Sequence, residues 1–102
     1  TMSDDKSLFV FFFHYTKDIE VIDELLDAHR DFLRGYYDEG IFLVSGPQVP
    51  RKGGLILARG ISKEKLQEIF KDDPFSQADA AEYKIVEFHP SMSAQCMAQV
   101  FD

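Results

Sequence analysis

The sequence LFVFFFHY, Leu8 to Tyr15, constrains the fold more than any other stretch of the chain. Its aromatic residues and its valine are typical of a β-strand. Alternate side chains of a strand point to opposite faces of the sheet, so this apolar run has two apolar faces. One face carries Leu8, Val10 and Phe12, and the other carries Phe9, Phe11 and Phe13. A strand with one face open to water should alternate apolar and polar residues, so we expect both faces to be covered.

The rest of the chain predicts three more strands and two main helices around this strand. The predicted strands are residues 41–45, 55–59 and 83–88, and the predicted helices are residues 19–39, 63–70 and, as a short third helix, 74–81. Thr16 and Asp18 are candidate caps of the first helix, Gly40 ends it, and Ser62 caps the second. The order βαββαβ is the split pattern of ferredoxin-like folds. We therefore expect an α+β domain with a four-stranded antiparallel sheet and its helices on one face.

The other face of this sheet has no covering element in a chain of this length. The predicted strand 55–59 is also apolar on both faces until Arg59. Large exposed apolar patches usually mark interfaces, and most soluble oligomers are symmetric homo-oligomers. We therefore expect a homodimer in which two sheets pack face to face.

The composition predicts one small domain and excludes several classes of function. The chain has 102 residues, 45% of them hydrophobic, and a net charge of −7. That charge argues against a nucleic-acid-binding protein and against binding to an anionic membrane surface. The longest apolar run is too short to span a membrane, and the first residues lack a signal-peptide pattern. The single cysteine, Cys96, cannot form an internal disulfide, which fits a cytoplasmic location.

We place the domain at residues 8–90. Residues 1–7 are expected to be disordered, and Thr1 ahead of Met2 is interpreted as a remnant of expression. Residues 91–102 form a C-terminal tail, which either docks on the partner subunit or is disordered.

One histidine lies on the apolar stripe of the first predicted helix. At about 100° per residue, this stripe contains Ile22, Leu25, Leu26, His29, Leu33 and Tyr36. His29 is in the middle of the buried face, where the pattern alone would place a leucine. Two interpretations are open: a core histidine bonded to backbone or water, or an acid or base that needs a partner to fix its tautomer.

Asp73 is the candidate partner of His29. Asp73 precedes Pro74, which is the preferred start of a helix, so the carboxylate is also a candidate N-cap. The two roles are compatible because a carboxylate accepts several hydrogen bonds. The neighbouring Asp72 is expected to be solvated at the end of the preceding helix.

Three further residues are candidates for substrate binding. His14 ends the first strand on the side of Val10 and could line a pocket mouth, although a histidine at a strand end is more often half exposed. The hydroxyl of Ser45 could contact a ligand or only stabilise a turn. Phe75 is expected to be part of the apolar walls of a pocket, and such walls suit an aromatic-sized ligand. Tyr15, Tyr36 and Tyr37 are interpreted as packing residues. The histidines are scattered and no phosphate-binding loop is present, so we expect no metal and no cofactor.

Several of these motifs together resemble the YciI-like (YCII-related) family. They are LLDAHRDFL, a second strand ending in SGP, and DPFSQADAAEYKIVEFHP. The resemblance extends over roughly residues 8–90 and implies a ferredoxin-like dimeric α/β barrel with a site built on a His–Asp pair. That pair corresponds to His29 and Asp73. Many members have an arginine shortly before the histidine, where this chain has Leu26, Asp27 and Ala28.

Together these observations predict a homodimer with a small-molecule pocket between sheet and helices. His29 would act as general acid and base on a small cyclic or unsaturated organic compound, and Asp73 would orient the imidazole. The expected reaction is a cofactor-free isomerisation or elimination. The alternative is a non-catalytic ligand-binding or accessory homodimer, in which the same pair is structural.

Overall fold

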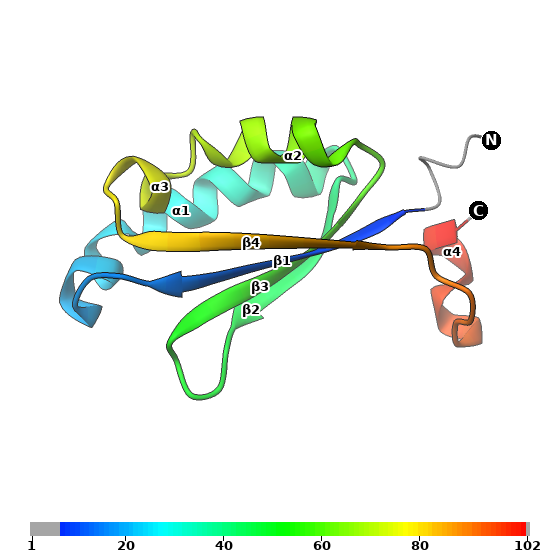
Figure 1. The fold of residues 1–102 in the computed structure, drawn as a ribbon, viewed down its shortest axis with the longest axis horizontal. Helices are drawn as coiled ribbons and strands as arrows, with labels where there is room; N and C mark the ends of the chain where they lie inside the picture. Colours follow the sequence, from blue (N-terminus) through cyan, green and yellow to red (C-terminus); the bar gives the residue numbers. More distant parts are fainter. Residues whose placement is uncertain (1–6, 102) are drawn as a thin grey trace.

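The computed structural model describes residues 7–101, which form a four-stranded sheet with three helices on one face (Figure 1). The elements are β1 Leu8–Tyr15, α1 Ile19–Asp38, β2 Phe42–Pro47, β3 Gly53–Arg59, α2 Lys63–Phe70, α3 Pro74–Gln77, β4 Ala81–Phe88, the 3-10 turn η2 Gln95–Met97 and α4 Ala98–Phe101. The strand order is β2-β3-β1-β4, and every pairing is antiparallel. The predicted α+β, ferredoxin-like architecture is confirmed. The predicted disorder of residues 1–7 concerns residues that, apart from Ser7, lie outside the described part of the chain.

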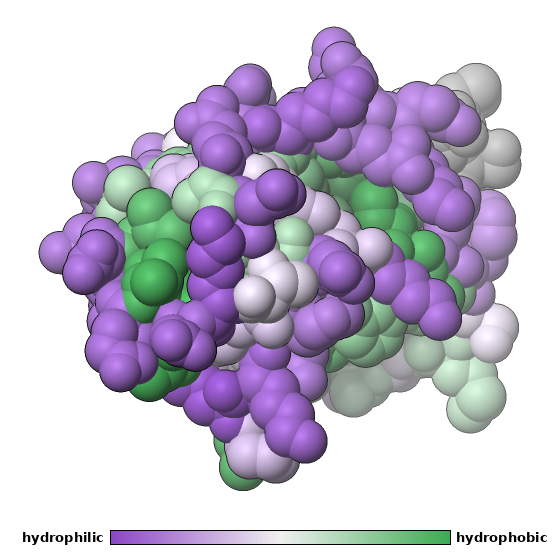
Figure 2. Space-filling model, turned by 60° about the vertical axis from the view of Figure 1, so that its left-hand side comes forward, coloured by the Kyte–Doolittle hydropathy of each residue, from purple (hydrophilic) through white to green (hydrophobic). Residues whose placement is uncertain are grey.

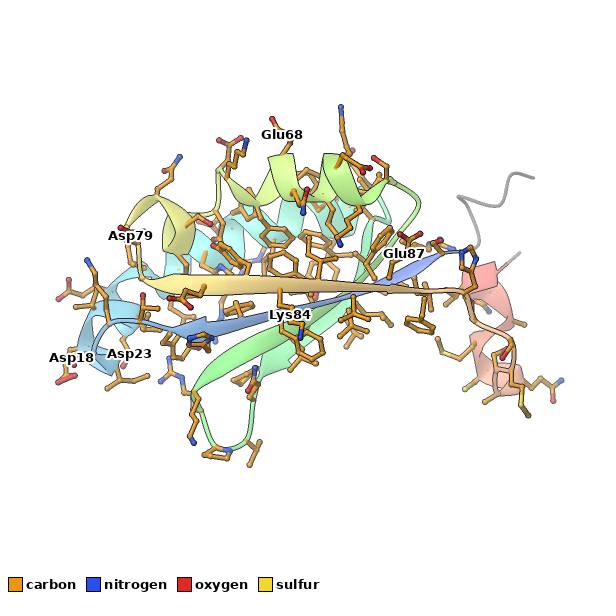
Figure 3. All side chains as sticks on the ribbon, in the orientation of Figure 1. Asp18, Asp23, Glu68, Asp79, Lys84 and Glu87 are labelled. Atoms are coloured by element: carbon orange, nitrogen blue, oxygen red, sulfur yellow. The ribbon has the colours of Figure 1, made fainter. Side chains whose placement is uncertain are left out.

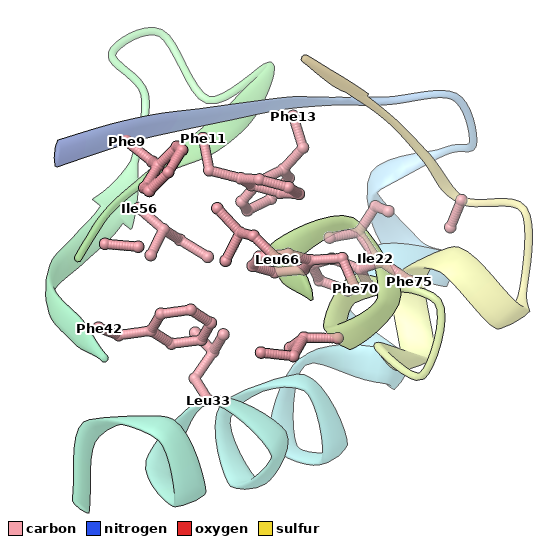
Figure 4. Packing of buried hydrophobic residues seen from close by; sticks show 13 residues of the cluster. Phe9, Phe11, Phe13, Ile22, Leu33, Phe42, Ile56, Leu66, Phe70 and Phe75 are labelled. Atoms are coloured by element: carbon pink, nitrogen blue, oxygen red, sulfur yellow. The ribbon is translucent and has the colours of Figure 1, made fainter. Parts of the chain in front are cut away.

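The apolar strand β1 is central, with β3 on one side and β4 on the other. Its residues Phe9, Phe11 and Phe13 point toward the helices and are at most 6% exposed. They form the core with side chains of all three helices (Figure 4). The ring of Phe70 from α2 stacks on Phe11 with a centroid distance of 3.6 Å. Burying a phenylalanine side chain contributes about 1.5–3 kcal/mol, so this layer accounts for much of the stability.

The helix ends differ in part from the predictions. Asp18 occupies the N-cap position of α1, but its side chain makes no capping hydrogen bond. Thr16 is not a cap either, because its hydroxyl donates to the carbonyl of Asp79 and joins the end of β1 to the start of β4. Ser62 caps α2 as predicted, accepting a hydrogen bond from the backbone N–H of Lys65.

The third helix is shorter than predicted. It ends at Gln77 rather than near residue 81. Asp79 has a φ of 57°, which is outside the helical region, and Ala81 already pairs with Tyr15 as the first residue of β4. The pairing of β4 with β1 therefore takes the residues that local pattern assigned to the helix.

The second face of the sheet is apolar, and no helix of residues 7–101 packs on it (Figure 1). On this face lie Val10, Phe12, Val44, Leu55, Leu57, Val86 and Phe88, of which Val44 is 58% exposed. Lys84 points to the same side, whereas Glu87 points toward the helices (Figure 3). The helices η2 and α4 lie at one end of the sheet, where the guanidinium of Arg59 donates to the carbonyl of Val100.

Hydrophilic side chains cover most of the side of the molecule that includes the start of α1, with smaller hydrophobic areas between them (Figure 2). Among the described residues, none of the helices is both long enough and apolar enough to cross a membrane.

Candidate active site

The structure brings His29 and Asp73 into contact. The Nδ1 atom of His29 lies 2.8 Å from Oδ1 of Asp73. Both residues are buried: His29 is 5% exposed and Asp73 is 0% exposed. His29 comes from the middle of α1, and Asp73 is the N-cap residue of α3. Helical periodicity thus buries the imidazole, and the Asp-Pro helix start places the carboxylate beside it.

Asp73 is both a cap and a partner of His29. Its Oδ1 also accepts a long hydrogen bond of 3.4 Å from the backbone N–H of Phe75, which caps α3. Its Oδ2 accepts from the hydroxyl of Tyr83 at 3.3 Å. The hydroxyl of Ser76 in turn donates to the Tyr83 hydroxyl. Donors on three elements therefore fix the carboxylate, and the shortest of its bonds goes to the imidazole.

Tyr83 remains a donor in this network over the usual pH range. Burial raises the pKa of Tyr83 well above its ordinary value, and the nearby Asp73 charge adds to the shift, although the hydrogen bond from Ser76 opposes it. The phenol is therefore protonated and keeps donating to Asp73.

Two aromatic rings hold the imidazole of His29 in place. The ring of Phe75 stacks on it with a centroid distance of 4.1 Å and an interplanar angle of 15°. Phe13 meets it edge-on at 5.6 Å. A carboxylate can only accept hydrogen bonds, so Nδ1 of His29 carries the proton, and in the neutral ring Nε2 carries the lone pair.

The Nε2 atom of His29 is not fully buried, and His29 borders a cavity. Among the described residues, every buried side-chain nitrogen or oxygen has a hydrogen-bond partner. Nε2 makes no such bond within that part of the chain, so it is not one of the buried atoms. His29 lines a cavity of about 360 Å³, which is within the usual range for small-molecule sites. The imidazole, with a nitrogen that has no partner in the described part of the chain, therefore borders the space where a ligand would bind.

The cavity lies between α1 and the β2–β3 hairpin. Phe13, Tyr15 and Phe75 supply aromatic walls. Ser45 also lines it, because a bulge between Phe42 and Val44 shifts the register and places Ser45 opposite Ile56 on the helix side of the sheet. Its hydroxyl hydrogen-bonds to that of Tyr37, so Tyr37 does more than pack.

The predicted site residues therefore do not all meet. Phe75 and Ser45 line the cavity with His29, and Asp72 is exposed as expected. His14 does not line this cavity. His14 lies on the open face of the sheet, its side chain is 60% exposed, and its Nε2 is 3.5 Å from the carboxylate of Glu82. Successive side chains of β1 point to opposite faces of the sheet, so His14 points away from the cavity that Phe13 lines.

Sequence reasoning missed three residues of the site. Tyr83 could have been found, because alternation along β4 places it on the same face as Ile85, toward the helices. Arg30 is not part of the predicted apolar stripe of α1, yet it lines the cavity beside His29. Arg51, in the loop between β2 and β3, also lines the cavity, and no local pattern indicated this. Within residues 7–101, no three histidine, cysteine or acidic side chains gather closely enough to hold a metal ion.

Comparisons with known proteins agree with this fold. One similar structure is 5-chloro-2-hydroxyhydroquinone dehydrochlorinase (TftG) from Burkholderia phenoliruptrix in complex with 2,5-dihydroxybenzoquinone. It has a TM-score of 0.68 and 16% identity, and the match covers 84% of this chain and 95% of that chain. Another is SnoaB, a cofactor-independent oxygenase from Streptomyces nogalater, with a TM-score of 0.53, 10% identity and coverage of 89% and 98%. At these identities the likeness shows a shared fold.

A search of curated proteins finds no match. The sequence model of the YCII-related domain matches residues 7–89, which is most of the chain. The chain therefore belongs to the YCII-related domain family.

Proposed function

We propose that this protein is a small-molecule enzyme in which His29 transfers protons as general base and general acid. One observation carries the proposal: Nδ1 of His29 is bonded to the buried carboxylate of Asp73, while Nε2 has no partner in the described part of the chain and His29 lines a cavity of about 360 Å³. A base must be oriented by a third group and must be open to the substrate, and this histidine meets both conditions.

Asp73 would orient the imidazole and stabilise its protonated form. When Nε2 takes a proton, the ring becomes positively charged, and the Asp73 oxygen at 2.8 Å attracts it. The stack with Phe75 and the bonds from Tyr83 to Asp73 keep the ring from turning away. The proton transfer itself uses only these side chains.

The reaction would be an isomerisation or an elimination at a small cyclic or unsaturated compound. In an isomerisation, Nε2 takes a proton from one carbon and the imidazolium returns it to another. In an elimination, the C–H electrons form a double bond while the leaving group departs with its own bonding pair. The aromatic walls from Phe13 and Tyr15 suit a flat ring. The dehydrochlorinase of the same fold, solved with 2,5-dihydroxybenzoquinone, supports this class of reaction and of substrate.

The proposal includes a homodimer. The open face of the sheet carries the apolar side chains of Val10, Leu55 and Leu57, and a hollow of about 430 Å³ runs along it. Exposure of such a surface is unfavourable, and a second copy presents the same apolar surface to cover it. Leu55 and Pro47 line both this hollow and the cavity of His29, so the partner would lie against the rim of the site.

Proton exchange at carbon tests the proposal without knowledge of the substrate. Unsaturated lactones, cyclic enones and substituted hydroquinones would be incubated with the protein in D₂O and followed by proton NMR. We expect replacement of a carbon-bound proton by deuterium in at least one compound. His29→Gln should abolish the exchange, and His14→Gln, which changes an exposed histidine on the other face, should not.

Exchange that persists in His29→Gln, or no exchange with any compound, would contradict the proposal. A loss of about 1–3 kcal/mol of stability in His29→Gln without any exchange in the wild type would favour the non-catalytic alternative, because a structural pair leaves a buried partner unsatisfied when broken.

A further inference from the structure

We infer that the ligand of this cavity is a planar carboxylate, bound at the rim by Arg30 and Arg51 with its ring beside Phe13 and Tyr15. This inference rests on the proposed function for its choice of site and extends it by naming the substrate class. Three features of the cavity support it: the charge of its lining, the free donors of each arginine and the shape of its walls.

The cavity differs in charge from the protein around it. The whole chain has 18 acidic and 11 basic residues and a net charge of −7. Among the side chains that line the cavity, the fixed charges are those of Arg30 and Arg51, and none is a carboxylate. Asp73 lies behind the imidazole of His29 and is not part of the lining. Asp23 pairs with Arg51, but the charged side chains that a ligand would meet on the cavity walls are both cationic, which favours an anionic ligand over a cationic one.

Arg30 has its charge available for a ligand. It directly follows His29 on α1, and within residues 7–101 its guanidinium makes no hydrogen bond or ion pair. Arg34, one turn further along the helix, is paired with Asp31 and does not line the cavity. A guanidinium has five N–H donors in a flat fork that matches the two oxygens of a carboxylate.

Arg51 is held at the rim by neighbours that leave most of its donors unused. Its Nη2 is 2.7 Å from Oδ1 of Asp23. Its guanidinium carbon lies 5.9 Å from the centroid of the Tyr15 ring, which also lines the cavity. These contacts join the β2–β3 loop to α1 and fix the cation at the cavity edge. The bond to Asp23 engages only one nitrogen of the Arg51 guanidinium, so its other N–H groups can bind an anion.

The aromatic walls of the cavity are the reason to expect a planar ligand. The rings of Phe13 and Tyr15 line the cavity together with the imidazole of His29, on which the fully buried ring of Phe75 stacks. A flat conjugated ligand fits such walls. Its carboxylate at the arginines would leave its carbon skeleton beside Nε2 of His29. Charge recognition and proton transfer would then use different parts of the same ligand.

Benzoate and benzamide form a matched pair of probes, because they share a ring and differ in charge. Both would be titrated into the wild-type protein at low ionic strength, with binding followed by amide NMR shifts of the cavity residues. We expect benzoate to bind about tenfold more tightly than benzamide or better, because hydrogen bonds to a charged group are roughly twice as strong as neutral ones.

Three variants assign the effect. Arg30→Gln and Arg51→Gln should each weaken benzoate binding several-fold and leave benzamide binding unchanged. Arg34→Gln removes the same charge from the same helix outside the cavity, and it should change neither affinity. Equal affinities for the two probes, or no shifts at the cavity with either, would overturn the inference. So would an effect of Arg34→Gln as large as that of Arg30→Gln.

His29→Gln separates this inference from the proposed function. That variant should lose deuterium exchange but keep the preference for benzoate, because both arginines remain. If the wild type exchanges deuterium but does not prefer benzoate, only the substrate class is wrong. If it prefers benzoate but exchanges nothing, the proposed chemistry is wrong and the anion site stands.

Discussion

Replacing Asp73 by asparagine and by alanine should separate its two roles. If Asp73 only caps α3, Asp73→Asn should leave the free energy of unfolding unchanged, because Asn and Asp are equally good N-caps. If its charge also serves His29, asparagine replaces a charge-assisted hydrogen bond by a neutral one at 2.8 Å. The difference between the two kinds of bond is about 1 kcal/mol, and we expect that loss of stability in Asp73→Asn.

Alanine should cost more. It leaves Nδ1–H of His29 and the hydroxyl of Tyr83 without their acceptor, which costs about 1–3 kcal/mol in a buried site. The lost cap adds little, about 0.5 kcal/mol, because the bond to the N–H of Phe75 is long at 3.4 Å. We therefore expect a total of about 1.5–3.5 kcal/mol for Asp73→Ala.

Urea unfolding at neutral pH, followed by circular dichroism, measures both values. All proteins must be compared at one concentration, because dimerisation would make stability depend on it. Asp72→Asn is the matched control, since that neighbouring carboxylate is exposed and should not affect stability. An Asp73→Asn variant as stable as the wild type would refute the charge-assisted pair and leave Asp73 as a cap only.

Three further predictions address the network, the sheet and the open face. Stability should fall as pH rises above about 10, because the unfolded chain ionises its tyrosines while burial keeps Tyr83 protonated. Urea unfolding at two alkaline pH values should show a smaller loss of stability with pH in Tyr83→Phe than in the wild type. An equal loss in both proteins would contradict this. Gly53→Ala should prevent stable folding, since the new Cβ would lie 1.8 Å from the carbonyl oxygen of Phe13. Gly46→Ala should fold, because its new Cβ would meet no packed atom within 4 Å. A normal melting curve for Gly53→Ala would refute the close approach. Leu57→Glu should convert the dimer to a monomer by light scattering, because it buries an unpaired charge in the proposed interface, and an unchanged mass would exclude that interface.

Local sequence pattern was sufficient to predict the order of the main strands and helices and the positions of His29 and Asp73 on them. Alternation along β1 predicted its two apolar faces, and helical periodicity placed His29 on the buried side of α1. The Asp73-Pro74 pair predicted the start of α3, and the same Asp73 side chain meets His29. The burial of His29 and the start of α3 depend on residues close in sequence, whereas the contact between His29 and Asp73 joins distant segments and was implied by the family resemblance.

The rest of the site depends on contacts between distant segments. The bulge in β2 turns Ser45 toward the cavity, and a strict alternation would have turned it away. Arg51 reaches the rim because its loop is fixed by Asp23 on another element. The early end of α3 follows from the pairing of Ala81 with β1. None of these could be predicted from local propensity, because each is decided by tertiary packing.

The tautomer of His29 is the most direct test of the central claim. A long-range proton–nitrogen NMR spectrum of the ring, recorded at a pH where the imidazole is neutral, shows which nitrogen carries the proton. We predict that Nδ1 is protonated and Nε2 is not, because Asp73 accepts from Nδ1 at 2.8 Å. Asp73→Asn should raise the population of the Nε2–H form, which free histidine prefers in water. A wild-type ring protonated on Nε2 would contradict the account, because it would have no lone pair facing the cavity.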